Sequence, residues 1–368
     1  MKSINFVDLK KQWRHEKKEL LPIIDKILSS GSFVGGEEIN IFETNIAKYT
    51  KNKYAIGLNS GTDALTLGLH LLGVKKGDEV ITPPNSFIAS TAAIVHIGAK
   101  PVFVDVCDDQ NIDPYKIEKA ITKKTKAIMP VHLTGRMSNM EKIKTIADKY
   151  KIPIIEDAAQ SIGSKFKNKF SGYYSKIACY SGHPLKNLNA FGDSGYITTN
   201  DSSIAKKAKI LSNHGIQNRN IVKYFGYVSR MDNLQAGILN FHLKKLNRII
   251  DKRRKNAKIY FKNLEKNNVF FPNINKDNFD TFHTFVVQVK NRNSLQKYLK
   301  SNGIMTNIHY PIPIHLQPAT KFLKYKKGDF PITEKQSKEI LSLPINQYLD
   351  KDHIEKISYF INKFYKSK

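Results

Sequence analysis

Lys186 is the residue of this sequence whose position most clearly indicates a chemical role. It stands in a turn with few neighbouring charges, whereas most other lysines fall in polar clusters. A lysine in an apolar site near a protonated heterocycle has a lowered pKa, and its neutral amine is a nucleophile suited to Schiff-base formation. The turn follows a predicted strand, Ile177–Ser181. Because ligands of open α/β sheets bind beyond the carboxyl ends of strands, the other strand ends are where partners of this lysine are expected.

A glycine turn that carries hydroxyl groups follows another predicted strand, Tyr54–Leu58. It reads Asn59-Ser-Gly-Thr-Asp-Ala-Leu65 and opens a helix. Free backbone N–H groups, the helix dipole and Ser or Thr hydroxyls together form a cradle for phosphate. Taken alone, the turn is better explained by Thr62 capping the helix. The chain lacks G-x-G-x-x-G and G-x-x-x-x-G-K-[ST], which argues against a dinucleotide or nucleoside triphosphate site.

An aromatic ring and a carboxylate stand at two further strand ends. Phe87 follows the predicted strand Glu79–Thr82, and Asp157 ends the predicted strand 152–157. A carboxylate at the end of a strand buried on both faces is costly unless a cation or hydrogen-bond donors meet it. Taken singly, Phe87 is a core residue and Asp157 is equally well explained as a helix cap.

Together these features have one economical interpretation, a site for pyridoxal 5′-phosphate (PLP). This cofactor needs a lysine for its aldehyde, a carboxylate that keeps its ring nitrogen protonated, a ring stacked on its face and a phosphate cradle. Lys186, Asp157, Phe87 and the Ser60–Thr62 turn supply all four at one sheet edge. The sequence therefore predicts a PLP enzyme.

Characteristic motifs also occur, in order, along nearly the whole chain. They are Phe6-Val-Asp-Leu9, Ser30-Gly-Ser-Phe-Val-Gly-Gly36, Ser60-Gly-Thr-Asp-Ala-Leu65, Lys76-Gly-Asp-Glu-Val80, Gly98-Ala-Lys-Pro-Val-Phe-Val-Asp105, Glu156-Asp-Ala-Ala-Gln160, Pro184-Leu-Lys-Asn187, Gly192-Asp193, Ser229-Arg-Met-Asp-Asn-Leu-Gln-Ala236 and His309-Tyr-Pro-Ile-Pro-Ile-His-Leu-Gln317. With these blocks the sequence resembles the DegT/DnrJ/EryC1/StrS family of fold-type I, PLP-dependent nucleotide-sugar aminotransferases.

The resemblance implies a role for each cofactor-binding residue. Lys186 forms the Schiff base and moves protons between substrate carbon and cofactor, while Asp157 pairs with the pyridinium. Gln160 approaches the ring hydroxyl, and Phe87 stacks on the ring. The resemblance assigns phosphate binding to Ser60, Gly61, Thr62 and Ser181. The resemblance implies no metal, and Lys186 argues against a minority branch that has His in its place and performs dehydration.

The resemblance also implies a homodimer with the active site at the interface. In the family, the loop before Ser229 and Arg230 reaches the cofactor of the neighbouring subunit. The family commonly has Asn before this Ser-Arg pair, and its side chain touches the neighbour's phosphate. This chain has Val228 there, so that single contact is not expected.

The block that begins at His309 resembles family members that aminate C3 of a nucleotide-linked 3-keto sugar. The resemblance places His309 and His183 near the hexose and makes Tyr310 a further candidate, although loop packing explains Tyr310 equally well. Cations that would attract the sugar diphosphate are Arg219, Lys223 and Arg230, unless they are solvated surface charges.

We therefore expect transfer of the amino group of L-glutamate to C3 of a dTDP-linked 3-keto-6-deoxyhexose, for cell-surface polysaccharide or O-antigen synthesis. Amination at C4 of a 4-keto sugar and at C3 of a UDP-linked 3-keto uronic acid remain open. A non-catalytic regulator on the same fold is the alternative from a different class.

The composition allows a large globular core but is strongly basic. The 368 residues include 60 Lys+Arg and 32 Asp+Glu, a formal net charge of +28. This charge raises nucleic-acid binding as an alternative, although the lysines are scattered and no zinc-finger spacing accompanies them. Two cysteines suit a reducing compartment, and no signal-peptide core or membrane-length apolar run is present. We expect a cytoplasmic protein.

Short β-branched runs that alternate with helical patterns predict the elements that position these residues. Strands are predicted at Tyr54–Leu58, Glu79–Thr82, 101–106, 127–132, 152–157, Ile177–Ser181 and Gly195–Thr199, and helices at 63–72, 87–97, 114–121 and Met140–Tyr150. This alternation predicts an α/β fold with a mostly parallel sheet whose last two strands are antiparallel.

The last third of the chain has a different pattern. A long basic helix at 240–264 precedes short strands at 282–289 and 305–308 and further helices. We expect a large mixed-sheet, PLP-binding domain over residues 1–245 and a small α+β domain over residues 246–368, as in aspartate aminotransferase-like, fold-type I enzymes.

Overall fold

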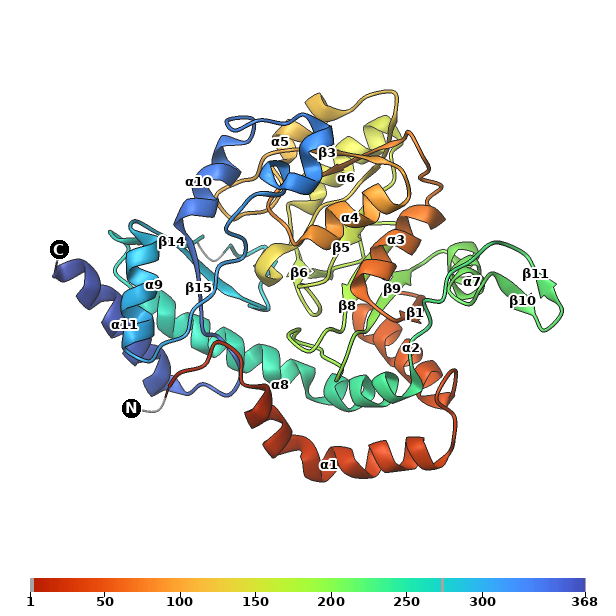
Figure 1. Ribbon diagram of the computed structural model, residues 1–368, viewed down its shortest axis with the longest axis horizontal. Coiled ribbons are helices and arrows are strands. Elements are labelled where there is room, and N and C mark those ends of the chain that lie inside the picture. The colour runs from red at the N-terminus through yellow and green to blue at the C-terminus, as the bar shows by residue number, and fades with distance from the viewer. Residues whose placement is uncertain (1–2, 273–274, 368) are drawn as a thin grey trace.

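A central mixed sheet organises the protein in a computed structural model that describes residues 3–272 and 275–367 (Figure 1). Its strands are β1 (Tyr54–Leu58), β2 (Glu79–Thr82), β3 (Lys100–Phe103), β4 (Thr125–Ile128), β5 (Ile155–Asp157), β8 (Ile177–Ser181) and β9 (Gly195–Thr199). They form two hydrogen-bonded groups in the orders β1-β9-β8-β5 and β3-β2-β4. The groups meet through the parallel bridges Ile128–Ile154 and Val131–Asp157.

Strand directions agree with the sequence prediction. β2 pairs in parallel with β3 and β4, and β5 pairs in parallel with β8. β9 runs antiparallel to β8 and to β1. Four of the seven strands have the predicted bounds, whereas β3, β4 and β5 are shorter than predicted because loop residues at their ends share the strands' apolar composition.

Helices cover both faces of this sheet. They are α1 (Leu9–Ser29), α2 (Glu37–Thr50), α3 (Gly61–Leu71), α4 (Ile88–His96), α5 (Pro114–Ile117), α6 (Met140–Tyr150), α7 (Ser202–Leu211), α8 (Asn233–Asn263), α9 (Arg292–Ser301), α10 (Pro331–Glu339) and α11 (Lys351–Lys366). Alternate residues of β8 face opposite cores: Ile177 and Cys179 pack with α3 and α7, and Ala178 and Tyr180 with α2 and α8. This burial on both faces confirms the predicted α/β fold class.

The amino-terminal helices α1 and α2 were not predicted. The buried positions of α1 include Gln12 and Glu16 besides Leu20 and Ile27, so its apolar period is interrupted by polar residues. Among the described residues, no helix is both long and apolar enough to span a membrane.

A second core lies in the carboxy-terminal third. The strands β12 (Val269–Phe270), β14 (Phe285–Val289) and β15 (Ile340–Leu343) form an antiparallel sheet that packs with α9 and α11. The strand predicted at 305–308 is wrong: Asn307 makes one isolated bridge to Ser342, and β15 takes the place in the sheet.

Helix α8 contributes to both cores. Leu246 packs with the large sheet, whereas Ala257 and Tyr260 belong to the second core. The predicted boundary at 245/246 therefore falls inside a continuous helix, and it stays a prediction. The helix begins seven positions before the predicted residue 240, because 233–239 already bury an apolar face.

Shorter elements complete the fold. They are β6 (Lys165–Phe166), β7 (Lys169–Phe170), β10 (Ile216–Asn218), β11 (Ile221–Val222), β13 (Asn278–Phe279) and the 3₁₀ turns Glu118–Ala120, Leu133–Gly135, Ile314–Leu316 and Pro318–Leu323. The hairpin of β10 and β11 projects from the body of the molecule beyond α7 (Figure 1).

Candidate active site

The glycine turn before α3 is packed against the end of β8. A Cβ atom at Gly61 would lie 2.8 Å from Cβ of Ser181, and one at Gly195 would lie 2.2 Å from the backbone oxygen of Ser60. The Ser60 hydroxyl accepts a hydrogen bond from Asp63 N at 3.0 Å, so Ser60, not Thr62, caps the helix. Glycine keeps the first turn of α3 and its N–H groups close to Ser181, which leaves a site suited to an anion.

Lys186 lies in a loop that is tied to two other parts of the chain. The Asn187 side chain donates to Thr281 O at 3.1 Å, and His242 Nδ1 donates to Asn189 O at 2.5 Å. Lys186 N itself donates to His183 O at 2.8 Å. These contacts fix the backbone on both sides of the lysine.

The environment of Lys186 prepares its amine for nucleophilic attack. Burial lowers the pKa of Lys186 to about 8, although the negative charge of Asp157 acts in the opposite direction. With this pKa, about a tenth of the amine is neutral at pH 7 and about half at pH 8, far more than for an ordinary lysine.

Asp157 is buried at the end of β5 and receives two hydrogen bonds. Ser90 Oγ donates to Oδ2 at 2.7 Å, and Ala159 N donates to Oδ1 at 3.1 Å. Burial raises the pKa of Asp157, and these donors together with the charge of Lys186 oppose the rise. The carboxylate has the partners that its position requires, and it can still accept from a protonated ring nitrogen.

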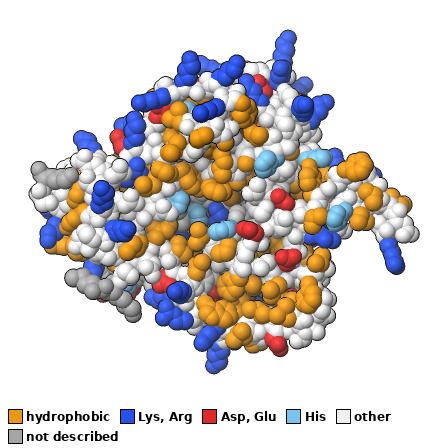
Figure 2. All heavy atoms as spheres, in the orientation of Figure 1, with side chains coloured by type: hydrophobic (Ala, Val, Ile, Leu, Met, Phe, Trp, Pro, Cys, Tyr) orange, Lys and Arg blue, Asp and Glu red, His pale blue; other side chains and the backbone are white. Residues whose placement is uncertain are grey.

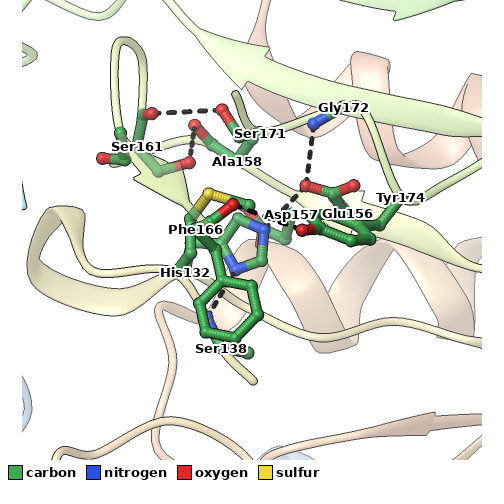
Figure 3. Close-up of polar contacts among 12 residues, drawn as sticks. His132, Ser138, Glu156, Asp157, Ala158, Ser161, Phe166, Ser171, Gly172 and Tyr174 are labelled. Carbon is green, nitrogen blue, oxygen red and sulfur yellow. Dashed lines mark hydrogen bonds and ion pairs between the residues drawn. The ribbon is translucent and has the colours of Figure 1, made fainter. Parts of the chain in front are cut away.

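His132 and Glu156 form a buried pair beside Asp157 (Figure 3). Ser138 N donates to His132 Nδ1 at 3.2 Å, so the imidazole proton is on Nε2, which donates to Glu156 Oε2 at 2.8 Å. Gly172 N donates to the same carboxylate oxygen at 2.8 Å. Both ring nitrogens of His132 thus serve hydrogen bonds within the protein.

Phe87, Tyr310 and Gln160 lie around the same sheet edge. The rings of Phe87 and Tyr310 are 5.8 Å apart, and Phe87 is 54% exposed, so it is not a core residue. Gln160 Oε1 accepts from Thr134 N at 2.8 Å, and Gln160 also hydrogen bonds with the Tyr310 hydroxyl. Burial and the charge of Asp157 raise the pKa of Tyr310, which therefore keeps its proton.

Three histidines share the electrostatic environment of Lys186. Burial and the charge of Lys186 lower the pKa of His309 to about 4 and also lower that of His183. His283 was not predicted, and burial, with the charges of Lys186 and Arg253, holds its pKa well below the usual range. Its Nδ1 atom is buried and has no hydrogen-bond partner among the described residues. The sequence around His283 has ordinary composition and no motif, so nothing in it indicated that this residue lies near Lys186.

The predicted cations lie in two places: Arg230 forms an antiparallel bridge with Leu58, just before the Ser60 turn, whereas Arg219 and Lys223 belong to the hairpin. Arg219 lies in the turn between β10 and β11, and Lys223 directly follows β11. This hairpin projects away from the body of the molecule (Figure 1). Arg230 Nη1 donates to Asn213 Oδ1 at 2.9 Å. Within one chain, the hairpin therefore carries Arg219 and Lys223 away from the cluster around Lys186.

Comparisons with known proteins agree with this geometry. The sequence profile of the DegT/DnrJ/EryC1/StrS aminotransferase family matches residues 14–362. A pleiotropic regulatory protein of Geobacillus stearothermophilus is 40% identical over 98% of this chain and 100% of its own length. The dTDP-3-amino-3,6-dideoxy-alpha-D-galactopyranose transaminase of Aneurinibacillus thermoaerophilus is 40% identical over 98% of this chain and 99% of its own.

Two further proteins extend the comparison. The UDP-2-acetamido-2-deoxy-3-oxo-D-glucuronate aminotransferase of Pseudomonas aeruginosa is 39% identical over 94% of this chain and 96% of its own. The crystal structure of S. venezuelae DesV in complex with a ketimine intermediate has a TM-score of 0.97 and 34% identity, and the match covers 99% of each chain.

The fold and the lysine–carboxylate edge define a PLP-dependent enzyme of fold-type I. The chain belongs to the DegT/DnrJ/EryC1/StrS aminotransferase family and is a sugar aminotransferase. Its residues fit the cofactor: the Gly61 cradle suits the phosphate, the buried Asp157 suits the ring nitrogen, and Lys186 supplies the amine.

Proposed function

We propose that the enzyme transfers the amino group of L-glutamate to C3 of a nucleotide-linked 3-keto-6-deoxyhexose, with dTDP as the nucleotide. The observation that carries the proposal is the pairing of Lys186, whose pKa is about 8, with the buried Asp157 at one sheet edge. The identity of 40% with a dTDP-3-amino sugar transaminase supports the choice of C3 and of dTDP. The product would serve cell-surface polysaccharide or O-antigen synthesis in the cytoplasm.

PLP supplies an aldehyde that stores the amine and a ring that accepts electrons during transamination. We assign the bond to the aldehyde, and the transfer of protons at the reacting carbon, to the amine of Lys186. Asp157 holds the proton of the ring nitrogen, Gln160 lies by the ring hydroxyl and Phe87 lies against the ring face. Ser60, Gly61, Thr62 and Ser181 surround the phosphate.

His183, His309 and Tyr310 are proposed to contact the hexose. His309 is neutral at physiological pH because its pKa is about 4, so it presents a hydrogen-bonding group and not a charge. A neutral histidine leaves the low pKa of Lys186 in place while the nitrogen atoms of its ring bind sugar hydroxyls.

A homodimer would bring the remaining cations to the site. Phe225, beside the hairpin, is 100% exposed, and Val222 and Val228 are 64% and 60% exposed. Hydrophobic side chains gather over this hairpin and over the lower part of the same face (Figure 2). Exposed apolar surface of this kind is expected at an interface, and it would place Lys223, Arg219 and Arg230 toward the diphosphate in the second subunit.

Two other functions have support from relatives. The relative that acts on a UDP-linked 3-oxo glucuronate favours the same chemistry on an acidic UDP-sugar. The relative named a regulatory protein favours a regulator on this fold, although Lys186 retains the position that catalysis needs.

The test is a product analysis by mass spectrometry. The enzyme is mixed with PLP, glutamate labelled with heavy nitrogen and a panel of dTDP-, UDP- and GDP-linked 3-keto and 4-keto sugars. We expect label in the dTDP-linked 3-amino sugar, with ping-pong kinetics because the cofactor stores the amine. Turnover only with 4-keto sugars, or with none, would refute the proposal.

Lys186→Ala is the matched control. It should keep the fold but lose the cofactor that borohydride fixes covalently to the wild-type chain, and it should lose turnover. Full turnover by this variant would contradict the role of Lys186.

A further inference from the structure

A chain of two buried hydroxyl groups leads to Asp157. Ser86 Oγ lies 2.9 Å from Ser90 Oγ and 3.0 Å from Phe87 O, and its single proton is directed at one of these two acceptors or shared between them. Ser90 Oγ in turn donates to Asp157 Oδ2 at 2.7 Å. Ser86 and Ser90 are 3% and 1% exposed, so water does not compete for these bonds.

Asp157 determines the direction of the hydrogen bonds in this chain of hydroxyl groups. An ionised carboxylate has no proton to give, so the hydroxyl proton of Ser90 points at Asp157. Ser90 can then accept from Ser86, and when the Ser86 proton points at Ser90 and not at Phe87 O, the dipoles of both hydroxyls align toward the negative charge. Hydrogen bonds to ionised groups are stronger than those between neutral groups, so the bond from Ser90 favours the ionised form of Asp157.

The position of the chain links two groups that would hold the cofactor ring. Ser86 and Ser90 flank Phe87, which precedes the first turn of α4. Residues 86–90 therefore determine both the position of the aromatic ring and the orientation of the carboxylate. Ala159 N holds the other oxygen of Asp157, so the carboxyl plane is defined from two sides.

We propose that Ser90, supported by Ser86, is a positioning residue that keeps the Asp157 carboxylate ionised and aimed at the ring nitrogen of PLP. The proposal rests on the assignment of Asp157 to that nitrogen in the proposed function. Burial raises the pKa of Asp157, and the bond from Ser90 is the leading effect that opposes this rise. The charges of Lys186 and His132 act in the same direction as Ser90. Cys179 and Tyr310, which also face Asp157, are kept protonated by burial and by its charge.

The test compares two cofactors in the full-length chain after its own cofactor is removed. One is PLP, and the other is the 1-deaza analogue, in which carbon replaces the ring nitrogen, so that it gains nothing from an ionised Asp157. The ratio of the two dissociation constants measures the contribution of the ring nitrogen alone, and fluorescence quenching reports both constants. Effects on packing or on general stability change both constants and cancel in the ratio.

Wild-type enzyme should prefer PLP, and Ser90→Ala should reduce that preference roughly tenfold, since a hydrogen bond to a buried charged group is removed. Thr91→Val is the matched control. Thr91 is 1% exposed on the same helix, and its hydroxyl has no hydrogen-bond partner among the described residues. This variant should keep the wild-type ratio.

The outcomes separate the two proposals. If the wild-type enzyme binds both cofactors equally, or if Asp157→Asn keeps the preference, the assignment of Asp157 fails. If wild type discriminates and Asp157→Asn does not, but Ser90→Ala keeps the full ratio or weakens both cofactors equally, the role of Ser90 is overturned.

Discussion

At the scale of single residues, the site is governed by opposing effects on Lys186 and Asp157. Burial favours the neutral form of each group, whereas the charge of each stabilises the charge of the other. The lysine settles at a pKa of about 8, which makes its amine available while Asp157 has hydroxyl and N–H donors to keep it ionised. His283 and His309 are held neutral nearby.

The reactivity of Lys186 should follow this balance. In the cofactor-free enzyme, the rate of reductive methylation of Lys186 should increase with pH, with a midpoint near pH 8. The neutral amine is the form that reacts, and it is lost as pH falls through the pKa. Asp157→Asn removes the charge that raises the pKa of Lys186, so the midpoint should move to lower pH. Peptide mass spectrometry measures the modification. An unchanged or higher midpoint in the variant would contradict the coupling.

The unpartnered Nδ1 of His283 should matter for the sugar but not for the cofactor. His283→Phe removes the hydrogen-bonding atom, and we expect about a tenfold rise in KM for the keto sugar with little change in PLP affinity. His283→Asn places a polar atom near the Nδ1 position and should retain much of the wild-type KM. Equal KM values for the Phe and Asn variants would show that Nδ1 binds no substrate.

At the scale of elements, the β10–β11 hairpin has few contacts with its own chain. Its strands have two and three residues, and the segment that follows it exposes Tyr227 and the fully exposed Phe225. An isolated hairpin of this size is marginally stable in water. Packing against a second subunit would stabilise the hairpin in one conformation.

Phe225→Glu should therefore dissociate the proposed dimer. Burying a carboxylate in an apolar interface is strongly unfavourable, so light scattering during gel filtration should report a monomer with weakened turnover. Tyr359→Glu is the control, since Tyr359 is 58% exposed on α11, remote from the hairpin in sequence. A Phe225→Glu variant that remains dimeric would place the interface elsewhere.

At the scale of the whole molecule, a buried carboxylate joins the large sheet to the carboxy-terminal region. Asp105, just after β3, accepts from Ile332 N at 3.1 Å and from Thr333 N at 2.9 Å. It therefore caps α10, whose own N-cap residue Phe330 makes no side-chain hydrogen bond to the helix. One helix is completed by a residue more than two hundred positions earlier in the chain.

Asp105→Ala should lower the free energy of unfolding by about 1–3 kcal/mol, because buried N–H groups lose a charged acceptor. Hydrogen exchange should accelerate in α10. The control is Asp201→Ala, which removes the N-cap of α7 and should leave hydrogen exchange in α10 unchanged. Unchanged exchange in α10 of the Asp105 variant would contradict the cap.

Much of this arrangement was predictable from the sequence, because strand ends and chemistry coincide. Lys186, Asp157 and Phe87 were expected at one edge, since the alternation of strands and helices determines which ends meet, and their roles toward the cofactor stay predictions. Residues such as Ser90 and His283 were missed because their roles depend on contacts between segments. The amino-terminal helices were missed because polar residues occupy buried positions such as Gln12 and Glu16.

The first described residues of the chain also complete the second core. Ile4 N donates to Gly303 O at 2.8 Å, Met305 N donates to Ile4 O at 3.0 Å, and the Ile4 side chain packs among residues from 257 to 364. This contact closes a loop of about three hundred residues, and such closure is slow because the chain must first lose its conformational freedom. During synthesis, the large sheet can form before residues 303–305 have been made, whereas the second core must wait for them. The order of synthesis therefore allows the lysine-bearing edge to form before the part of the chain that faces it.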